Sequence, residues 1–230
     1  MASPVSLSLR RLGLSALAVG LIALSVTGCV RLLEPRTSDA TYYLLHDPQS
    51  WSFPSTDTTG LAVGLRRTRM ASYLTDTRLV VRRGPHQIHF SEFHRWAEEL
   101  NRGISRTVAL ALMDRPDVRL AETVPWPKGS RFDYIVQLHV LNFEGVGPPP
   151  DPKAKENAPA PEGHSQMVVR WTILEPESET VLARGLTRHE HDGWRVTNYG
   201  ALASHLGEGL QKLANDLGDR LQTLDSPEAP

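Results

Sequence analysis

The sequence predicts a single α+β domain, residues 41–224, in which a four- to six-stranded, mostly antiparallel sheet carries two long amphipathic helices on one face. Apolar residues recur at helical spacing in two long stretches, 91–112 and 199–224. Strand-like stretches precede and separate them, and the consecutive ones within residues 132–188 favour antiparallel pairing. The order strands, helix, strands, helix is typical of an α+β fold, and no repeat or second domain boundary interrupts it.

The N-terminal residues 1–28 have the pattern of a secretory signal peptide. Arg10 and Arg11 supply positive charge, residues 12–26 form an apolar run, and Thr27 and Gly28 are small or modest residues before a predicted cleavage point. The apolar run has 15 residues, whereas a membrane-spanning helix needs about 18 or more. The segment therefore predicts export and removal rather than a membrane span.

Cys29 follows this segment and is the only cysteine among the 230 residues. A cysteine in this position resembles the bacterial lipobox, in which the thiol is diacylated and the peptide bond before it is cut. We therefore predict lipid attachment at Cys29, readable by palmitate labelling, and a lipidated tether of residues 29–40, since stable anchoring takes at least two acyl chains. The alternative is an ordinary secretory signal with an incidental cysteine. Val30 is not the aspartate that retains Gram-negative lipoproteins at the inner membrane, so the outer membrane is the predicted location.

Removal of residues 1–28 leaves 202 residues with 23 basic and 26 acidic side chains, a net charge of −3 with histidines neutral. No unmodified cysteine would remain for a disulfide, and a chain of this length can bury a core without one. Nucleic acid is not an expected partner, because binding a phosphate backbone requires clustered Lys and Arg, and export removes the chain from the nucleic acid compartment.

The strand-like stretches are bounded by turn residues and lie at 41–47, 61–66, 78–83, 86–90, 132–143, 166–174 and 180–188. Gly84 and Pro85 predict a hairpin or bulge between the third and the fourth. The strongest is 132–143, in which Tyr134, Val136 and Leu138 share one face. Residues 145–163 are rich in Pro, Gly and charge and predict a long mobile loop, and residues 225–230 predict a disordered tail.

The first helix is predicted from Ser91, as its N-cap, to Leu112, with Pro116 beyond its end. Phe93 and Trp96 would lie on its core side. The second helix runs from Tyr199 to Leu224, with leucines that step by three and four residues. We expect it to pack on its own sheet, and its heptad spacing leaves pairing between subunits as the alternative.

The common signatures of nucleophilic, nucleotide-binding and zinc-protease sites are absent from the sequence. The nearest candidate is His189 with His191, which would share one strand face, followed by Asp192. His86 and His89 would lie on opposite faces of a strand, and His94 on the next helix. Because no third ligand can be placed, we expect no metal, no cofactor and no catalytic residue. The alternative from another class is a lipid-anchored periplasmic hydrolase with a histidine metal site.

The stretch SEFHRWAEEL, residues 91–100, resembles a helix-opening segment of the ABC-type transport auxiliary lipoproteins, the paraquat-inducible protein C (PqiC) and YmbA-like group. Other segments follow in the family's order: YYLL at 42–45, VGLRRTRMASYLTDTRLVVR at 63–82, YIVQLHVLNFEG at 134–145 and RWTILE at 170–175. The sequence departs from the family at residues 75–77, where an acidic residue and then Arg-Pro are common, and in its Pro-rich loop.

This resemblance implies an auxiliary subunit without catalytic activity, anchored in the Gram-negative outer membrane and facing the periplasm. Its expected partners are a mammalian cell entry (MCE) domain protein and the ABC transporter subunits, which move phospholipid or another hydrophobic substrate between membranes. A homo-oligomeric ring is the assembly considered with this function. The cargo, the oligomer size and the docking surface do not follow from the sequence.

Overall fold

The computed structural model describes residues 39–46, 59–149, 151–153, 155 and 158–226. From Ala40 onward the chain forms one compact unit, and the predicted single α+β domain is confirmed. In chain order its elements are β1 (Thr41–Tyr43), β2 (Leu61–Leu65), β3 (Arg69–Met70), the 3-10 helix η3 (Ser72–Leu74), β4 (Arg78–Arg83), β5 (Ile88–Trp96), α2 (Leu100–Met113), β6 (Val118–Thr123), β7 (Tyr134–Gly147), β8 (Glu162–Leu174), β9 (Val181–Arg195) and α3 (Tyr199–Asp225). None of the described helices is long and apolar enough to cross a lipid bilayer.

Strand β7 lies at the centre of a sheet that has nine strands within the described residues. One edge of β7 pairs with β8, which pairs with β9, and both long ladders are antiparallel. The other edge pairs in succession with β2, β3 and β4, all parallel. The sheet continues from β2 to β6, and from β4 through β5 to β1. The strand number exceeds the predicted four to six because short strands such as β3 and β6 take their partners from distant segments and show little pattern of their own.

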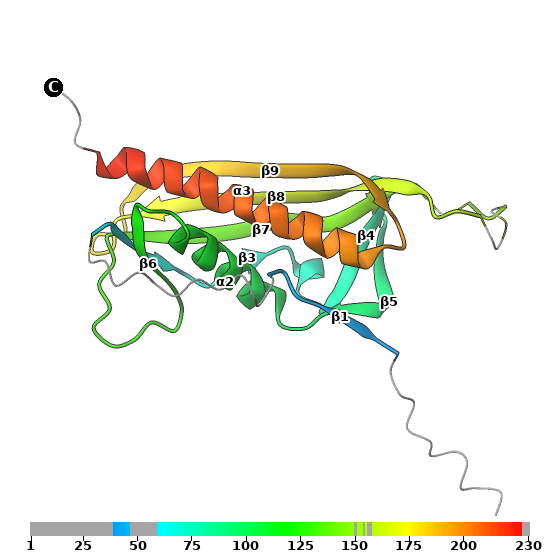
Figure 1. The fold of residues 1–230 in the computed structure, drawn as a ribbon, viewed down its shortest axis with the longest axis horizontal. Coiled ribbons are helices and arrows are strands. Elements are labelled where there is room, and N and C mark those ends of the chain that lie inside the picture. The colour runs from blue at the N-terminus through cyan, green and yellow to red at the C-terminus, as the bar shows by residue number, and fades with distance from the viewer. Residues whose placement is uncertain (1–38, 47–58, 150, 154, 156–157, 227–230) are drawn as a thin grey trace, which may run out of the picture. The chain divides into compact units, whose positions relative to one another are not determined.

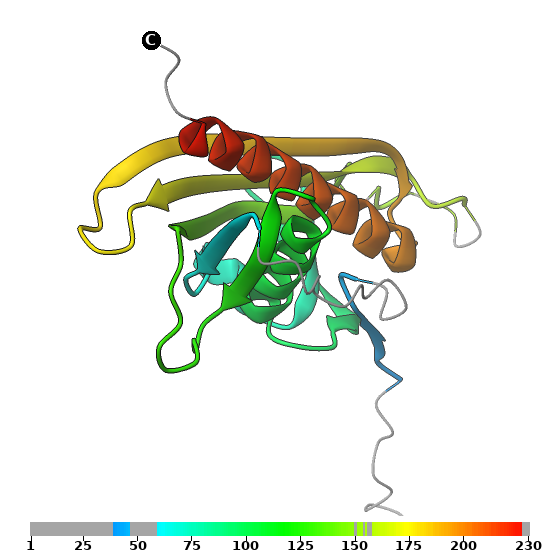
Figure 2. The same cartoon turned by 60° about the vertical axis from the view of Figure 1, so that its left-hand side comes forward.

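Both helices lie on one face of the sheet, with α3 along β7–β9 and α2 beside α3 (Figures 1 and 2). The predicted apolar stripe of α3 is buried, including Leu202, Leu206, Leu210, Leu213, Leu217 and Leu221. Full burial of one such side chain contributes about 1.5–3 kcal/mol, so the stripe fixes which side of α3 faces the sheet. Asn198 caps the helix, because its side-chain oxygen accepts a hydrogen bond from the Ala201 amide.

A β-bulge near Leu141 changes which residues of β7 face the helices. Val136, Leu138 and Val140 are buried before it, and Phe143 is buried after it, three positions further rather than two. Gly145 then lies directly beneath the Trp194 ring, where a Cβ atom would overlap the indole. The bulge thus sets the side of β7 on which the end of β9 packs.

The predicted helix from Ser91 is wrong in its first part. Residues 88–96 form strand β5, which pairs with β4 on one side and β1 on the other, and the helix begins only at Leu100. Trp96 is buried as expected, but Phe93 is 56% exposed rather than on a core side. Pairing with two neighbouring strands outweighed the helical spacing of these residues, while Leu100, Ile104, Val108 and Leu112 keep that spacing in α2.

The loop predicted for residues 145–163 is shorter than expected. Strand β7 continues to Gly147 and β8 begins at Glu162, so the connection spans residues 148–161. Its described ends are held by the adjoining strands: the Val196 amide donates to the Pro161 carbonyl at 3.1 Å, and the Arg83 guanidinium donates to the Pro148 carbonyl at 3.2 Å. The strand predictions 61–66 and 78–83 match β2 and β4 closely. The predictions 166–174 and 180–188 correspond to β8 and β9, but β8 begins earlier, at Glu162, and β9 continues to Arg195.

Candidate functional site

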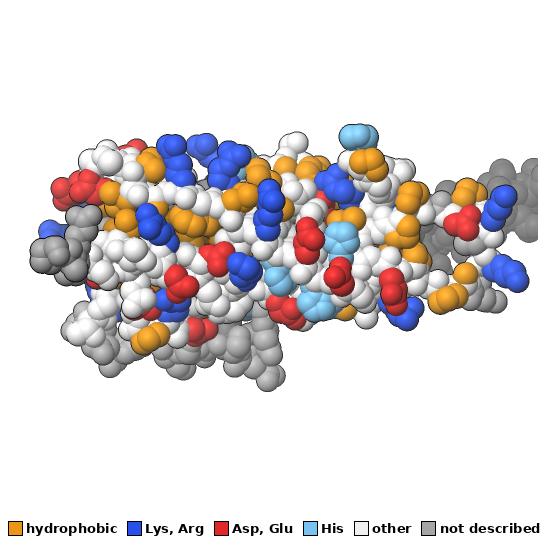
Figure 3. All heavy atoms as spheres, turned by 90° about the horizontal axis from the view of Figure 1, so that it is seen from above, with side chains coloured by type: hydrophobic (Ala, Val, Ile, Leu, Met, Phe, Trp, Pro, Cys, Tyr) orange, Lys and Arg blue, Asp and Glu red, His pale blue; other side chains and the backbone are white. Residues whose placement is uncertain are grey.

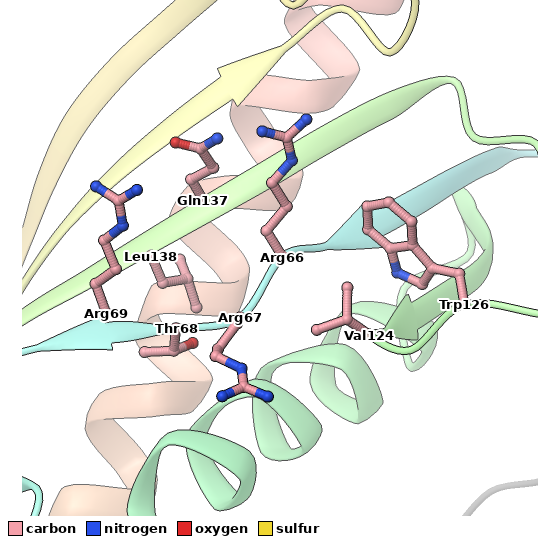
Figure 4. A pocket seen from close by; sticks show the side chains of 8 residues that line it. All are labelled: Arg66, Arg67, Thr68, Arg69, Val124, Trp126, Gln137 and Leu138. Atoms are coloured by element: carbon pink, nitrogen blue, oxygen red, sulfur yellow. The ribbon is translucent and has the colours of Figure 1, made fainter.

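A cleft of about 480 Å³ lies where the chain passes from β2 to β3 alongside β7. Figure 4 shows its lining side chains: Arg66, Arg67, Thr68, Arg69, Val124, Trp126, Gln137 and Leu138. The Arg66 amide donates to the Val136 carbonyl at 2.9 Å, and Arg69 is in register with His139, so the arginine-bearing segment runs along β7 throughout. We refer to this site as the arginine cleft.

Thr68 fastens the middle of this segment to helix α2. Its side chain is 3% exposed, and its hydroxyl lies 2.7 Å from the Ser105 hydroxyl. Ser105 donates in turn to the Asn101 carbonyl at 2.9 Å. Because Thr68 turns inward, its neighbours Arg67 and Arg69 are held at the surface, and both are exposed.

The charge of the cleft is positive. Arg66 forms an ion pair of 2.5 Å with Glu179 of the β8–β9 turn. Arg67 and Arg69 have no hydrogen-bond or ion-pair partner within the described part of the chain. Figure 4 shows Arg66, Arg69 and Gln137 extending to one side of β7, and Arg67 extending toward α2 on the other. Guanidinium groups with free donors bind carboxylate and phosphate oxygens in bidentate fashion, so the cleft is suited to an anionic group.

An apolar wall completes the cleft. Val124 is 36% exposed, and the Trp126 ring packs on Phe132 with 5.0 Å between centroids. The Trp126 indole nitrogen donates to the Glu122 carbonyl at 3.3 Å, which fixes the ring. Cations beside a fixed indole suit a ligand or peptide segment that carries both a negative charge and an apolar part. The lining residues provide binding groups, and they include no carboxylate, cysteine or histidine.

Further along β7 from the cleft, a fully buried carboxylate joins β4 to β7. Glu144 is 0% exposed, and its Oε1 lies 2.6 Å from a guanidinium nitrogen of Arg82 and 3.1 Å from the Asn142 amide nitrogen. Burial, together with the neighbouring Glu144, raises the pKa of the Tyr73 hydroxyl above its usual value. The ion pair links the parallel strands β4 and β7. Because Glu144 is fully buried, we interpret the pair as stabilising the fold rather than binding a ligand.

Residues 75–77, where the sequence departs from the family pattern, form the connection between η3 and β4. Asp76 accepts hydrogen bonds from the Arg78 guanidinium and from the Arg78 amide, the latter at 2.8 Å. These hydrogen bonds lower the pKa of Asp76 to about 2. The carboxylate therefore remains ionised at any ordinary pH and fixes the start of β4.

His189 and His191 share one face of β9, as predicted, and this face packs on α3. The His191 ring stacks on His205 of α3 with 3.7 Å between centroids, and its Nε2 lies 3.8 Å from a Glu208 oxygen. Sequence reasoning missed His205, since only the packing of α3 brings it close. Among the described residues, no group of three or more His, Cys, Asp or Glu side chains could hold a metal ion. The three imidazoles form part of the β9–α3 contact.

The other histidine candidates lie apart from this cluster. His86 is in the exposed turn between β4 and β5, and His89 is exposed on β5. His94 is on β5 rather than on the predicted helix; its Nδ1 is 2.9 Å from the Tyr43 hydroxyl, and its ring stacks on Tyr199. Cys29, the predicted lipid attachment site, lies outside the described residues.

Sequence reasoning did not select the arginine cleft, although the run Arg66-Arg67-Thr68-Arg69 belongs to a segment quoted for the family resemblance. The available signal was a dense group of cations beside a predicted strand, which is typical of an anion-binding surface. No sequence pattern indicated that Val124 and Trp126 belong to this site, because the pairing of β6 with β2 is what brings them beside the arginines.

The family model for the ABC-type transport auxiliary lipoprotein component matches residues 43–218. Comparison with curated protein sequences gives no match. Solved structures with a similar fold include the following two. Protein XCC0632 from Xanthomonas campestris, assigned to the DUF330 family model, has a TM-score of 0.58 at 16% identity, covering 80% of this chain and 93% of that one. An uncharacterized protein has a TM-score of 0.58 at 14% identity, covering 79% of this chain and 98% of that one. At such identities the likeness shows the fold alone.

Proposed function

Because the chain belongs to the family of ABC-type transport auxiliary lipoproteins, we propose that it is the lipid-anchored subunit of an MCE-type lipid transport system at the outer membrane. The observation that carries the proposal is the extent of the family match, which runs from β1 into α3 and so covers nearly the whole described domain. In this function the protein binds and positions its partners, an MCE-domain protein with its ABC permease and ATPase, and the transported substrate is phospholipid or a similar hydrophobic molecule.

The anchor in this proposal is Cys29. An apolar run, small residues and then a cysteine favour lipidation of the thiol, and residues 29–40 connect it to β1. Replacement of Cys29 by Ser removes the only thiol, so we expect palmitate incorporation to disappear and the protein to lose processing or membrane attachment. Persistent labelling of the variant would contradict the assignment.

Contact with the transport partner is assigned to the arginine cleft. Arg67 is exposed, without a partner among the described residues, and lies beside the apolar wall of Val124 and Trp126. This combination is suited to an acidic segment of the partner that also carries an apolar side chain.

Co-purification tests the function. The full lipidated chain, tagged at its C-terminus and extracted from cross-linked envelopes in mild detergent, should recover an MCE-domain protein together with the permease and ATPase. Recovery of none of them would reject the proposal. Arg67→Glu should strongly reduce this recovery. Arg220→Glu, an equal charge change at an exposed position of α3, should leave it intact. Equal recovery with both variants would place the contact outside the cleft.

A further inference from the structure

The face of the sheet opposite the helices carries a row of basic side chains, a histidine on β7 and arginines on β8 and β9. Strand register aligns His139 with Arg170 and Arg170 with Leu186, while Arg184 and Arg188 flank Leu186 on the same side of β9. We call His139, Arg170, Arg184 and Arg188 the basic sheet face. The residues that alternate with them along β8 and β9 point to the other side, toward α3.

The three arginines of the basic sheet face are exposed, and none has a carboxylate partner within the described residues. Elsewhere in the same fold Arg78, Arg82 and Arg115 are all ion-paired. Figure 3 views the molecule from the β9 side and shows Lys and Arg side chains gathered along the border of this face, with Asp and Glu interspersed on the helix side. Glu190, two positions beyond Arg188 on the same side of β9, accepts a hydrogen bond from Gln166, so the positive charge of this face is concentrated at Arg170, Arg184 and Arg188.

The form of this face suits an extended anionic occupant. Neighbouring strands lie about 4.8 Å apart, so the cations stand side by side on an open sheet rather than around a cavity. Leu186, 44% exposed, stands among them, and Leu182 nearby on β9 is 38% exposed. Arginines interspersed with exposed aliphatic side chains are the composition of surfaces that rest on charged lipid headgroups, where the cations meet phosphate and the apolar groups enter the interface.

We propose that the basic sheet face docks onto the headgroups of anionic phospholipids in the bilayer that holds the lipid anchor. This inference rests on the proposed attachment at Cys29, because the twelve residues 29–40 then keep β1 within about 40 Å of that bilayer, even when fully extended. A domain so tethered meets the membrane at high effective concentration, so individually weak contacts suffice to orient it. Docking would hold the helices α2 and α3 away from the lipid.

A site-specific fluorophore tests this orientation. Because lipidation consumes the only native thiol, a new cysteine in the full lipidated chain can be labelled alone; the parent chain serves as the blank. Thr172→Cys places an environment-sensitive dye beside Arg184 on the basic sheet face, and Gln211→Cys places it on exposed α3. Reconstituted into phosphatidylglycerol-containing vesicles, the Thr172 label should show a blue shift that is absent from phosphatidylcholine vesicles and from the Gln211 label.

The charge dependence is tested with two matched triple variants. Arg170→Glu, Arg184→Glu and Arg188→Glu together should abolish the shift, and Lys128→Glu, Lys153→Glu and Arg220→Glu, the same charge change at exposed positions elsewhere, should preserve it. With the unaltered arginines, 1 M salt should remove the blue shift, because the Debye length falls to about 3 Å. If the first triple variant does not fold, this salt dependence replaces it as the test of the charge requirement. An equal response to both lipids, or a shift of the Gln211 label instead, would overturn the proposal.

Vesicle flotation of the same samples separates the two assignments. Flotation of the chain with either lipid shows that the lipid anchor holds it on the vesicle. The dye response shows whether the basic sheet face contacts the bilayer. A chain that floats without a dye response refutes docking and leaves the anchor in place, and a chain that fails to float refutes the anchor. A dye response that follows added transport partner, and not vesicle charge, would instead identify the basic sheet face as a protein contact and contradict membrane docking.

Discussion

Gly145 is the residue at which β7 leaves the least room for a side chain. The Trp194 ring covers its Cα, is 0% exposed, and is fixed by a hydrogen bond of 2.7 Å from its indole nitrogen to the Asn198 carbonyl. Since neither the ring nor the strand can move freely, an added methyl group should cost about 1–3 kcal/mol. The absence of a side chain at this position thus determines how closely β9 and α3 approach the sheet.

We therefore expect Gly145→Ala to lower the melting temperature by several degrees, at about 2–4 °C per kcal/mol for a domain of this size. Gly200→Ala is the control, because a Cβ there would have ordinary van der Waals contact with Asn198 Oδ1 at 3.7 Å, and alanine is favoured over glycine in a helix. Thermal denaturation followed by circular dichroism provides the comparison. Equal melting of Gly145→Ala and the parent would show that Trp194 can be displaced at little cost.

His205 links the stability of the β9–α3 contact to pH. Burial lowers the pKa of its imidazole, and the nearby His191 and His189 lower it further, against the opposing charge of Glu208. The folded protein then binds fewer protons than the unfolded chain, in which histidine titrates near pH 6.5. The free energy of unfolding is thus unaffected by this residue well above pH 6.5 and decreases as the pH falls below that value.

His205→Gln should therefore reduce the loss of melting temperature between pH 7.5 and pH 5.5. The loss should not vanish, because burial also lowers the pKa of His94. His86→Gln, in the exposed β4–β5 turn, is the matched control and should leave the pH dependence unchanged. If His205→Gln retained the full pH dependence, the β9–α3 histidines would not be its source.

At the scale of elements, sequence pattern predicted the long segments and failed where pairing is non-local. The apolar patterns of β7 and α3 were recognisable because each pattern extends over many residues. Strand β3 has only two residues, Arg69 and Met70, and exists because it meets β7 about seventy positions later. The arginine cleft depends on that same register and on the pairing of β6 with β2, so its cations were visible in the sequence while their arrangement was not.

Strand β5 illustrates the reverse error and provides an element-scale prediction. As a helix, residues 91–96 would bury both Phe93 and Trp96. As part of strand β5, they bury Trp96, whose ring centroid lies 5.9 Å from that of Phe143, and leave Phe93 exposed. Trp96→Ala should then cost about 3–5 kcal/mol, and Phe93→Ala should cost little. Urea denaturation of both variants measures the difference. Comparable losses for the two would favour the helical assignment over β5.

At the scale of the whole molecule, the proposed anchor lies apart from the folded domain and from its two proposed contact surfaces. The helices cover one sheet face, and the core lies between them and the sheet. The opposite face carries Arg170, Arg184 and Arg188 and also the Arg66, Arg69 and Gln137 side of the arginine cleft, whereas Arg67 of the cleft extends toward α2. The proposed anchor at Cys29 is outside the described fold and connects to it through residues 29–40 alone. A substitution next to Cys29 should therefore change the membrane in which the protein is found without changing the stability of the folded domain.

Val30→Asp tests this separation. Because Val30 precedes the described domain, which begins at residue 39, the variant should melt at the same temperature as the parent and should still incorporate palmitate at Cys29. An aspartate directly after the lipidated cysteine is the inner-membrane retention signal of Gram-negative lipoproteins, so the variant should move from the outer- to the inner-membrane fraction, whereas Val30→Ala should not. Unchanged outer-membrane recovery of Val30→Asp would mean that another part of the chain, such as the basic sheet face or a bound partner, determines its location.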